Sequence, residues 1–357
     1  MLRKILHKIL VVICSFFILG LVLGSISQYV NPNSFGYLAF FGLAYPYFLF
    51  INIVFFFYWV YRKKKVFILP LFAILVSYPA FAKLISFGES NSEIITKSFK
   101  VLSYNVRYFN KYNWNKDPRT SYHIIDLINK KDPNIVCLQE FMYGHNKNIS
   151  ITTIKRKLKK YPYYYISKRR NLAIFSKYKI INKKELKISN SLSASVIYSD
   201  VLIGRSKLRI YNAHLESNRF SKDDYKFIKN ITSSASSEQT VDGAKGIGKR
   251  LLHAFKIRAE QAKLIRRKVD ASKLKSILCL DMNDTPLSYS YRILRGNYKD
   301  SFLEKSVGIG TTYIGDFPSF RIDYILYHPD LYCTDYERYK YKYSDHYPIS
   351  ASFKIDF

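Results

Sequence analysis

Six apolar segments between residues 100 and 350 each end in, or carry, an amide, carboxylate or imidazole side chain. The segments are KVLSYN, NIVCLQE, LRIYNAH, SILCLDMN, FRIDYIL and YKYSDHYPI, and their polar residues are Asn105, Glu140, His214, Asp281, Asn283, Asp323, Asp345 and His346. A buried strand ordinarily excludes charge, because an unpaired buried ion is costly. One polar residue at a strand end can simply meet solvent. Six such segments in one domain predict instead that the polar residues converge on one pocket.

The residue types in this set indicate a particular chemistry. Carboxylate and amide oxygens are the ligands that Mg²⁺ and Mn²⁺ prefer. No cysteine stands among the strand ends, so the set does not favour structural zinc. An imidazole beside a carboxylate, as in the adjacent Asp345 and His346, suits a general acid or base. Together these groups favour metal-assisted attack of water on a phosphate ester.

The same segments, in the same order, resemble the endonuclease/exonuclease/phosphatase superfamily. That superfamily includes AP endonucleases, pancreatic-type deoxyribonucleases, neutral sphingomyelinases and inositol polyphosphate phosphatases. The matching motifs cover residues 100–353 and are SYNVR, CLQE, NLAIFSKYKI, YNAHLES, LDMNDTP, RIDYIL and SDHYPI. The resemblance implies an α/β fold, a four-layer αββα sandwich of two packed mixed β-sheets with the site at one edge. It also implies a divalent metal, Mg²⁺ or Mn²⁺.

The resemblance assigns three residues to the metal. Glu140 corresponds to the metal ligand, with Asn105 its neighbour at the metal side and Asp345 beside the metal. No other cofactor is implied.

Five further residues correspond to catalytic positions of the superfamily. Asp281 would orient or deprotonate the attacking water, and Asn283 would hold a phosphate oxygen or that water. His346, oriented by Asp323, would contact the phosphate, and His214 would contact it from the other side.

The chain departs from the superfamily pattern at two positions. Leu280 stands where glycine often precedes the catalytic aspartate, and Asn171 stands where glycine often precedes LAIFSK. Neither departure removes a ligand. AP endonucleases usually carry tyrosine at the position of His214, whereas the other branches carry histidine, which argues against abasic-site repair.

Charge and composition leave the substrate open. The chain of 357 residues has a net charge of +31, and residues 91–357 hold 49 of the 57 Lys/Arg and 25 of the 26 Asp/Glu residues, a net of +24. A basic domain attracts nucleic acid or an anionic membrane surface, although the excess also fits a chain rich in lysine throughout. The leading prediction is a metal-dependent phosphoesterase, with a nuclease slightly favoured. The alternatives are a lipid or inositol head-group phosphoesterase and a non-enzymatic, membrane-tethered binding module. No specific protein partner is indicated.

The N-terminal region predicts a membrane anchor. Residues 9–61 contain no Asp, Glu, Lys, Arg or His, and QYVNPNSFGY at 28–37 divides this stretch into two segments long enough to span a bilayer. Residues 66–82 form a third, weaker segment interrupted by Pro70 and Pro79. A cleaved signal peptide over 1–27 is the alternative, but no convincing cleavage site follows it. The predicted organisation is therefore an anchor over 1–87, a linker over 88–98 and a catalytic domain over 99–357.

The positive charges predict the orientation of the anchor. Arg3, Lys4 and Lys8 flank the chain start and Arg62–Lys65 separate the second and third segments, so both regions are expected in the cytoplasm of a cell with a bacterial-type inner membrane. Three spans would place the catalytic domain on the outer, periplasmic side. If the third segment lay in the interface, the domain would be cytoplasmic.

Periodicity within the catalytic domain predicts helices over 123–131, 152–161 and 249–269, and a mobile loop over 230–248 because of its serine and glycine content. The four cysteines, Cys14 and Cys137 among them, have no metal-finger spacing and are expected to be buried thiols.

Overall fold

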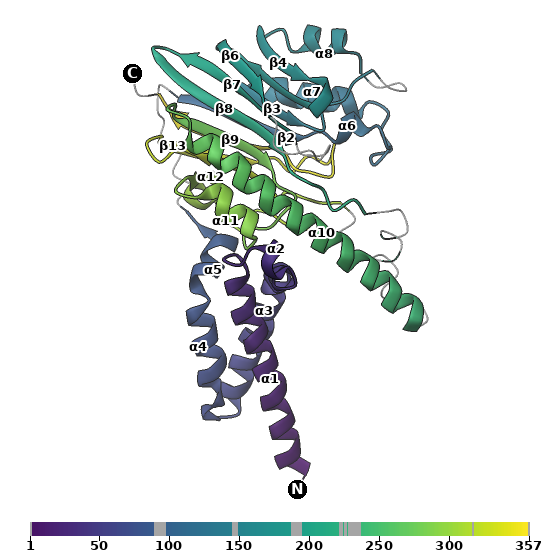
Figure 1. Ribbon diagram of the computed structural model, residues 1–357, viewed down its shortest axis with the longest axis vertical. Coiled ribbons are helices and arrows are strands. Elements are labelled where there is room, and N and C mark those ends of the chain that lie inside the picture. The colour runs from purple at the N-terminus through teal and green to yellow at the C-terminus, as the bar shows by residue number, and fades with distance from the viewer. Residues whose placement is uncertain are drawn as a thin grey trace.

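The computed structural model describes residues 2–88, 98–144, 149–186, 195–220, 224, 227, 237–315 and 318–355. An elongated bundle of N-terminal helices stands below a layered α/β domain (Figure 1). The bundle consists of α1 (Leu2–Ser27), α2 (Pro32–Phe35), α3 (Leu38–Tyr61), a short 3₁₀ turn (Lys65–Phe67), α4 (Ile68–Val76) and α5 (Tyr78–Leu84).

Two six-stranded mixed sheets form the centre of the upper domain. The first has the order β10-β12-β9-β8-β7-β6 and the second β13-β14-β2-β3-β5-β4. The bounds in the first sheet are β6 (Lys179–Glu185), β7 (Ser195–Ile203), β8 (Ser206–His214), β9 (Ser276–Asp281), β10 (Lys299–Asp300) and β12 (Asp323–Tyr327). Those in the second are β2 (Ser98–Asn105), β3 (Ile135–Gln139), β4 (Tyr163–Ser167), β5 (Leu172–Ser176), β13 (Cys333–Arg338) and β14 (Ile349–Lys354).

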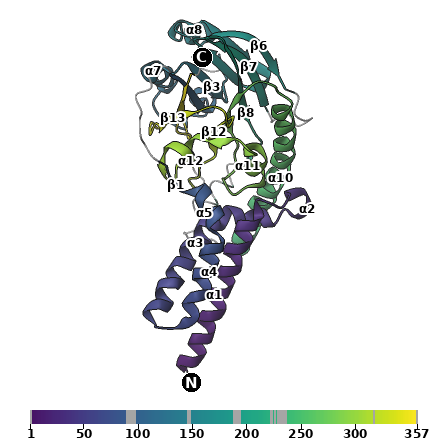
Figure 2. The same cartoon turned by 90° about the vertical axis from the view of Figure 1, so that its left-hand side faces the viewer.

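Helices cover the outer faces of both sheets. On one side lie α10 (Ser237–Asp270) and α11 (Tyr289–Arg295), and on the other α7 (Thr120–Lys131) and α8 (Ile151–Lys157) (Figure 2). Short elements complete the domain: α6 (Arg107–Asn110), a 3₁₀ turn (Lys168–Arg170), α12 (Ser301–Lys305), and the paired β1 (Ser86–Phe87) and β11 (Val307–Gly308). Three apolar cores separate the layers, one between the sheets and one under each helical layer. The predicted four-layer αββα sandwich is confirmed.

The first sheet's long covering helix differs from the sequence prediction. α10 begins at Ser237, so the predicted loop is wrong over 237–248, while 230–236 lies outside the described residues. Glycine lowers helix propensity, but tertiary contacts override it here. Phe227 lies directly over Gly243, and Arg250 forms a 2.8 Å ion pair with Asp224.

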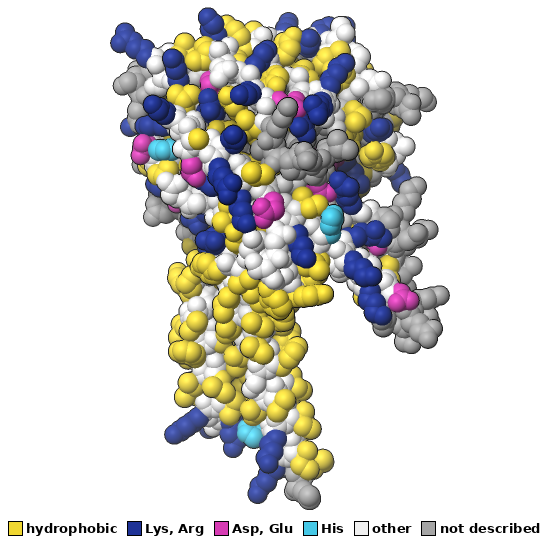
Figure 3. All heavy atoms as spheres, viewed as in Figure 1, with side chains coloured by type: hydrophobic (Ala, Val, Ile, Leu, Met, Phe, Trp, Pro, Cys, Tyr) yellow, Lys and Arg dark blue, Asp and Glu magenta, His cyan; other side chains and the backbone are white. Residues whose placement is uncertain are grey.

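The bundle contains helices of membrane-spanning length. α1 and α3 are each long and apolar enough to cross a bilayer, and the pair formed by Lys65–Val76 and Tyr78–Leu84, bent by 58°, would be a third span if counted as one. On the face shown in Figure 3, apolar side chains cover the bundle down to a group of Lys and Arg side chains at its far end. Close approach of α1 and α3 depends on glycine, since a Cβ at Gly24 would lie 2.8 Å from the Phe41 carbonyl oxygen.

The bundle and the sandwich are joined by direct contacts rather than by the chain alone. Arg292 Nε donates to the Gln28 carbonyl at 2.9 Å, and Arg321 Nη2 donates to the Lys83 carbonyl at 2.9 Å. The Phe40 ring meets Phe255 of α10 edge-on at 5.4 Å. The predicted linker over 88–98 lies almost wholly outside the described residues.

Candidate active site

The edge of the two sheets nearest the bundle collects the polar residues. The carboxyl ends of the parallel pairs β2–β3 and β8–β9 both lie there, which brings Asn105, Glu140, His214 and Asp281 together. β12 runs antiparallel to β9 and therefore contributes its first residue, Asp323, which is paired in register with Asp281. Asp345 and His346 stand in the turn before β14 rather than at a strand end.

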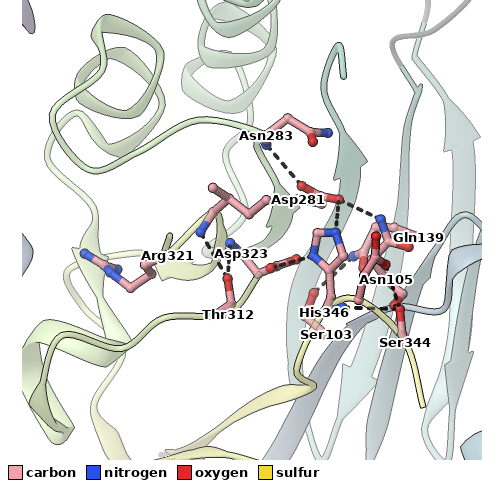
Figure 4. Close-up of polar contacts among 12 residues, drawn as sticks. Ser103, Asn105, Gln139, Asp281, Asn283, Thr312, Arg321, Asp323, Ser344 and His346 are labelled. Carbon is pink, nitrogen blue, oxygen red and sulfur yellow. Dashed lines mark hydrogen bonds and ion pairs between the residues drawn. The ribbon is translucent and has the colours of Figure 1, made fainter. Parts of the chain in front are cut away.

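Asp281 is the centre of this arrangement. Its side chain is fully buried, and it accepts hydrogen bonds from Asn105 Nδ2 at 2.7 Å and from the Asn283 backbone N–H at 3.0 Å (Figure 4). His214 Nε2 lies 3.6 Å and His346 Nε2 3.9 Å from Asp281 Oδ2. Both imidazoles therefore face the same carboxylate oxygen without a direct hydrogen bond to it.

His346 and Asp323 form a buried pair. His346 Nδ1 lies 2.9 Å from Asp323 Oδ2, which leaves Nε2 as the ring nitrogen directed at Asp281. Burial alone would lower the pKa of His346, but the carboxylates of Asp323 and Asp281 outweigh it and raise the pKa to about 9. Burial raises the pKa of Asp323, an effect that His346 opposes. The pair fixes the ring orientation and favours the imidazolium at neutral pH.

Glu140 and Asn283 have unusual backbone conformations. Their φ angles are 49° and 50°, in the left-handed region that most residues avoid. The Glu140 carbonyl accepts from Tyr108 N at 2.9 Å, which helps to hold the turn. The Asn283 amide donates to the Leu215 carbonyl at 3.2 Å and lies 3.1 Å from His214 Nε2. Such strain concentrated at one edge of the sandwich is typical of a functional site.

Glu140 is the most open acidic group of the site. Its side chain is 18% exposed, and among the described residues its nearest ionisable partner is His214, whose Nε2 lies 3.7 Å from Glu140 Oε1. A carboxylate that lines a cleft without a close protein donor suits a Mg²⁺-type ion, which binds one or two carboxylates and keeps several waters. Asp281, Asp323 and His346 also form a buried group that could hold a metal ion by ligand type.

The two other predicted metal residues are engaged within the protein. Asn105 Oδ1 accepts from the Arg107 backbone N–H at 2.9 Å, and its Nδ2 binds Asp281. The Asp345 carboxylate forms an ion pair with Arg107. A role for either as a direct ligand stays a prediction.

A cleft of about 260 Å³ opens over this edge and is lined by Glu140, Asn283, Asp345 and His346. The cleft is also lined by residues that were not predicted from the sequence. Tyr313 meets the His346 ring edge-on at 5.3 Å, and buried Arg258 forms an ion pair with Asp284 at 3.1 Å. Neither belongs to a motif, because each is placed by tertiary packing. Arg107 stands inside SYNVR, so its position in that motif was the available signal.

A polar network between the sheets supports the site from below. Gln139, next to Glu140, donates through Nε2 to Ser103 Oγ at 3.0 Å and to Asn212 Oδ1 at 2.8 Å. Asn212 donates in turn to the Leu138 and Ala173 carbonyls. This network ties β8 of one sheet to β3 and β5 of the other.

Comparison with known families gives two matches. Residues 102–346 match the model of the Endonuclease/Exonuclease/phosphatase family, and residues 7–84 match a domain of unknown function, DUF8431. The predicted superfamily is therefore confirmed. No curated protein matches the sequence.

Solved structures share the fold of the catalytic domain. Humanized TDP2 from D. rerio is 15% identical, with a TM-score of 0.53, and the match covers 72% of this chain and 99% of that one. An endonuclease/exonuclease/phosphatase from Bacteroides vulgatus is 16% identical, with a TM-score of 0.51 and the same coverage. D. rerio TDP2 complexed with a single-strand DNA product is 15% identical, with a TM-score of 0.51 and again the same coverage. At these identities the likeness concerns the fold alone.

Proposed function

Because the chain belongs to the Endonuclease/Exonuclease/phosphatase family, we propose that it is a membrane-anchored phosphoesterase that depends on a divalent metal. The observation that carries the proposal is the convergence of Asp281, Asn283, His214 and the His346–Asp323 pair beside Glu140 at one cleft. Proton donors and acceptors, an imidazole pair and an open carboxylate are the groups that ester hydrolysis at phosphorus requires.

In this proposal Asp281 orients and deprotonates the attacking water. Asn105 and the Asn283 backbone N–H, which both bind its carboxylate, hold it in place. His346 is favoured as the imidazolium at neutral pH, so its Nε2–H would donate to a phosphate oxygen rather than accept a proton. Asp323 keeps that ring in position. His214 and Asn283, in contact with each other, would bind a second phosphate oxygen.

The metal, Mg²⁺ or Mn²⁺, would be held by Glu140, with Asn105 and Asp345 nearby. When bound, it would neutralise charge on the phosphate and bring its own coordinated waters. Arg107, Arg219 and Arg258 also line the cleft, each in an ion pair with a protein carboxylate.

The anchor would hold this site at a membrane surface. α1, α3 and the bent pair of α4 and α5 supply three crossings if the pair spans. Lysines and arginines at the far end of the bundle favour the cytoplasm for that end, which would place the catalytic domain on the outer face. Fusion of alkaline phosphatase after residue 90 in a Gram-negative host tests this orientation. An active fusion supports it, whereas an inactive phosphatase with a bright cytoplasmic fluorescent fusion overturns it.

Catalysis is tested with the full chain in detergent and bis-para-nitrophenyl phosphate as a chain-free diester. We expect turnover that EDTA abolishes and Mg²⁺ or Mn²⁺ restores. Full activity in EDTA would remove the metal from the proposal. Absence of turnover with every ester would favour the non-enzymatic binding module.

Nucleic acid is one candidate for the natural phosphate-ester substrate. The net charge of +24 over residues 91–357 favours it, and a structural neighbour was solved with a single-strand DNA product. Hydrolysis of DNA or RNA by the full chain, with a rate that falls steeply as salt rises, would support this candidate.

A further inference from the structure

The cleft is not walled by the catalytic domain alone. Leu43 of the spanning helix α3 lines it, together with Phe255 of α10 and Phe320. Apolar residues of the bundle and of the catalytic domain therefore share the lining of the cleft with Glu140 and His346.

A second cavity of about 230 Å³ lies next to the cleft at the junction of bundle and sandwich. Leu43, Thr285 and Phe320 line both cavities, so the two adjoin. The second cavity is also lined by Pro46 and Tyr47 of α3, by Ile309 and by Arg321. Tyr47 and Ile309 are 56% and 63% exposed, so they form an outer rim.

The depth of this second cavity follows from the length of α3. The hydrocarbon core of a bilayer takes about 20 helical residues at about 1.5 Å each. Counted back from Tyr61, just before the Arg62–Lys65 cluster, this length ends near Gly42. The same count on α1, forward from Lys8, ends near Gln28. The rim at Tyr47 therefore lies inside the hydrocarbon boundary, and the cleft lies just outside it.

We propose that the second cavity binds an acyl chain of a bilayer phospholipid whose phosphate occupies the cleft. This inference rests on the proposed phosphoesterase function and names its substrate class. A lipid places its phosphate at the boundary and its chain below it, which matches the order of the two cavities. A nucleic acid strand has no group that would use an apolar cavity at hydrocarbon depth.

Hydrolysis of such a lipid is balanced without a further reactant. The water oxygen bonds to phosphorus, one ester P–O bond breaks, and the leaving oxygen takes up a proton. A phosphodiester lipid thus yields an alcohol and a phosphate monoester.

The acyl site predicts a dependence on chain length. A methylene that leaves water contributes about fourfold in binding, or about 0.8 kcal/mol. With the full chain in detergent, kcat/KM should rise at least about tenfold from a deacylated glycerophosphodiester to the dioctanoyl phospholipid with the same head group. Phosphatidylglycerol, phosphatidylethanolamine, phosphatidylinositol and sphingomyelin are compared in parallel, because the cavity does not select the head group. Equal kcat/KM with and without chains, or faster turnover of DNA or RNA, would overturn the inference.

A matched pair of variants tests the cavity itself. Ile309→Trp should fill the rim, whereas Val307→Trp changes a residue of similar exposure, 67%, two positions away and outside the cavity lining. The measured quantity is the ratio of kcat/KM for the dioctanoyl lipid to that for bis-para-nitrophenyl phosphate. We expect this ratio to fall at least about tenfold in Ile309→Trp and to stay at the wild-type value in Val307→Trp.

An unchanged ratio in Ile309→Trp, with circular dichroism showing a folded protein, would reject the acyl site. Turnover of bis-para-nitrophenyl phosphate without any turnover of lipid would also reject it while leaving the phosphoesterase in place. If Mg²⁺ supports turnover of no ester at all, the proposed function itself fails.

Discussion

Arg321 and Asp323 are only two positions apart in the chain, but each forms a buried ion pair in a different region of the molecule. Arg321 faces the junction with the bundle, where Nη1 lies 2.6 Å from Asp300 Oδ2. Asp323 faces the catalytic edge, where it binds His346 at 2.9 Å. Arg321 and Asp323 are each only 3% exposed, and Figure 4 shows their side chains pointing in opposite directions.

The two pairs differ in the groups that surround them, and this difference indicates which pair stabilises the fold and which could take part in catalysis. Asp300 also accepts from the Tyr291 hydroxyl at 2.8 Å and from the Phe302 backbone N–H at 3.0 Å, and the second Arg321 nitrogen binds the Lys83 carbonyl. The junction pair thus has several protein partners, and Arg321 also lines the second cavity. At the catalytic edge, His346 reaches the cleft with Nε2 directed toward Asp281. Of the two pairs, only the catalytic one directs a ring nitrogen toward the carboxylate of Asp281 at the cleft.

The largest effect is expected at the junction. Arg321→Met leaves Asp300 buried without its cation, and breaking a buried pair in this way costs about 3–5 kcal/mol. The melting temperature in detergent should fall by roughly 5 °C or more. Arg205→Met, at an exposed turn position, is the control and should change it little. A wild-type melting temperature in Arg321→Met would show that this ion pair does not stabilise the junction.

Substitutions at the catalytic edge should lower the turnover rate rather than the stability of the fold. Asp281→Asn and His346→Ala should each lower kcat for bis-para-nitrophenyl phosphate at least about a hundredfold, because Asp281 is the proposed base and His346 the proposed hydrogen-bond donor to the phosphate. Steady-state kinetics measure the loss, and circular dichroism checks the fold. His123→Ala, at a residue that does not line the cleft, is the control. A folded Asp281→Asn enzyme with wild-type kcat would contradict the role proposed for this carboxylate.

The catalytic edge was largely predictable from sequence, and the junction was not. Residues at strand ends, such as Asp281 and Glu140, interrupt apolar runs, so each carries a local signal of its position. The structure brings all eight predicted residues to one edge, although Asp323 lies at the start of its strand and His346 in a turn. Strand direction was not predictable locally, because the pairing of β12 with β9 is a long-range contact.

Leu43 illustrates why the junction escaped prediction. In sequence it is one of many apolar residues of a predicted spanning segment, and only the docking of α3 on the sandwich places it in the cleft wall. Arg258 likewise lies in a helix with ordinary periodicity, and its burial against Asp284 depends on how α10 crosses the sheet. Asn171 was noted in the sequence as a departure from the superfamily pattern, but only the structure explains it. Its φ is 50°, a conformation that favours the glycine common at this position in the superfamily and that asparagine tolerates.

The His346–Asp323 pair should also make the thermal stability of the protein depend on pH, and this effect is expected to be smaller. The pKa of His346 in the folded protein, about 9, exceeds its ordinary value of 6.5. The resulting stabilisation is complete below pH 6.5 and is lost as the pH rises through 9. Thermal unfolding in EDTA between pH 6.5 and 9.5 should therefore show a falling melting temperature. Asp323→Asn removes the largest cause that raises this pKa, so its melting temperature should fall less over the same range. Equal slopes in the two proteins would refute the assigned coupling.

The smallest expected effect concerns the bend that brings the bundle to the junction. α4 and α5 meet at Ser77, and the buried Tyr45 hydroxyl of α3 lies 3.1 Å from the Ser77 carbonyl oxygen and 3.0 Å from its Oγ. If the pair spans a membrane, as proposed above, the polar groups at this break would need an internal partner, and α3 supplies one. Tyr45→Phe should cost about 1 kcal/mol, the usual net value of one hydrogen bond. The melting temperature in detergent should fall by roughly 2–4 °C. Tyr37→Phe, whose side chain is 64% exposed, is the matched control and should leave it unchanged. If Tyr45→Phe lowered the melting temperature as much as Arg321→Met, the bend would stabilise the junction as strongly as the ion pair does.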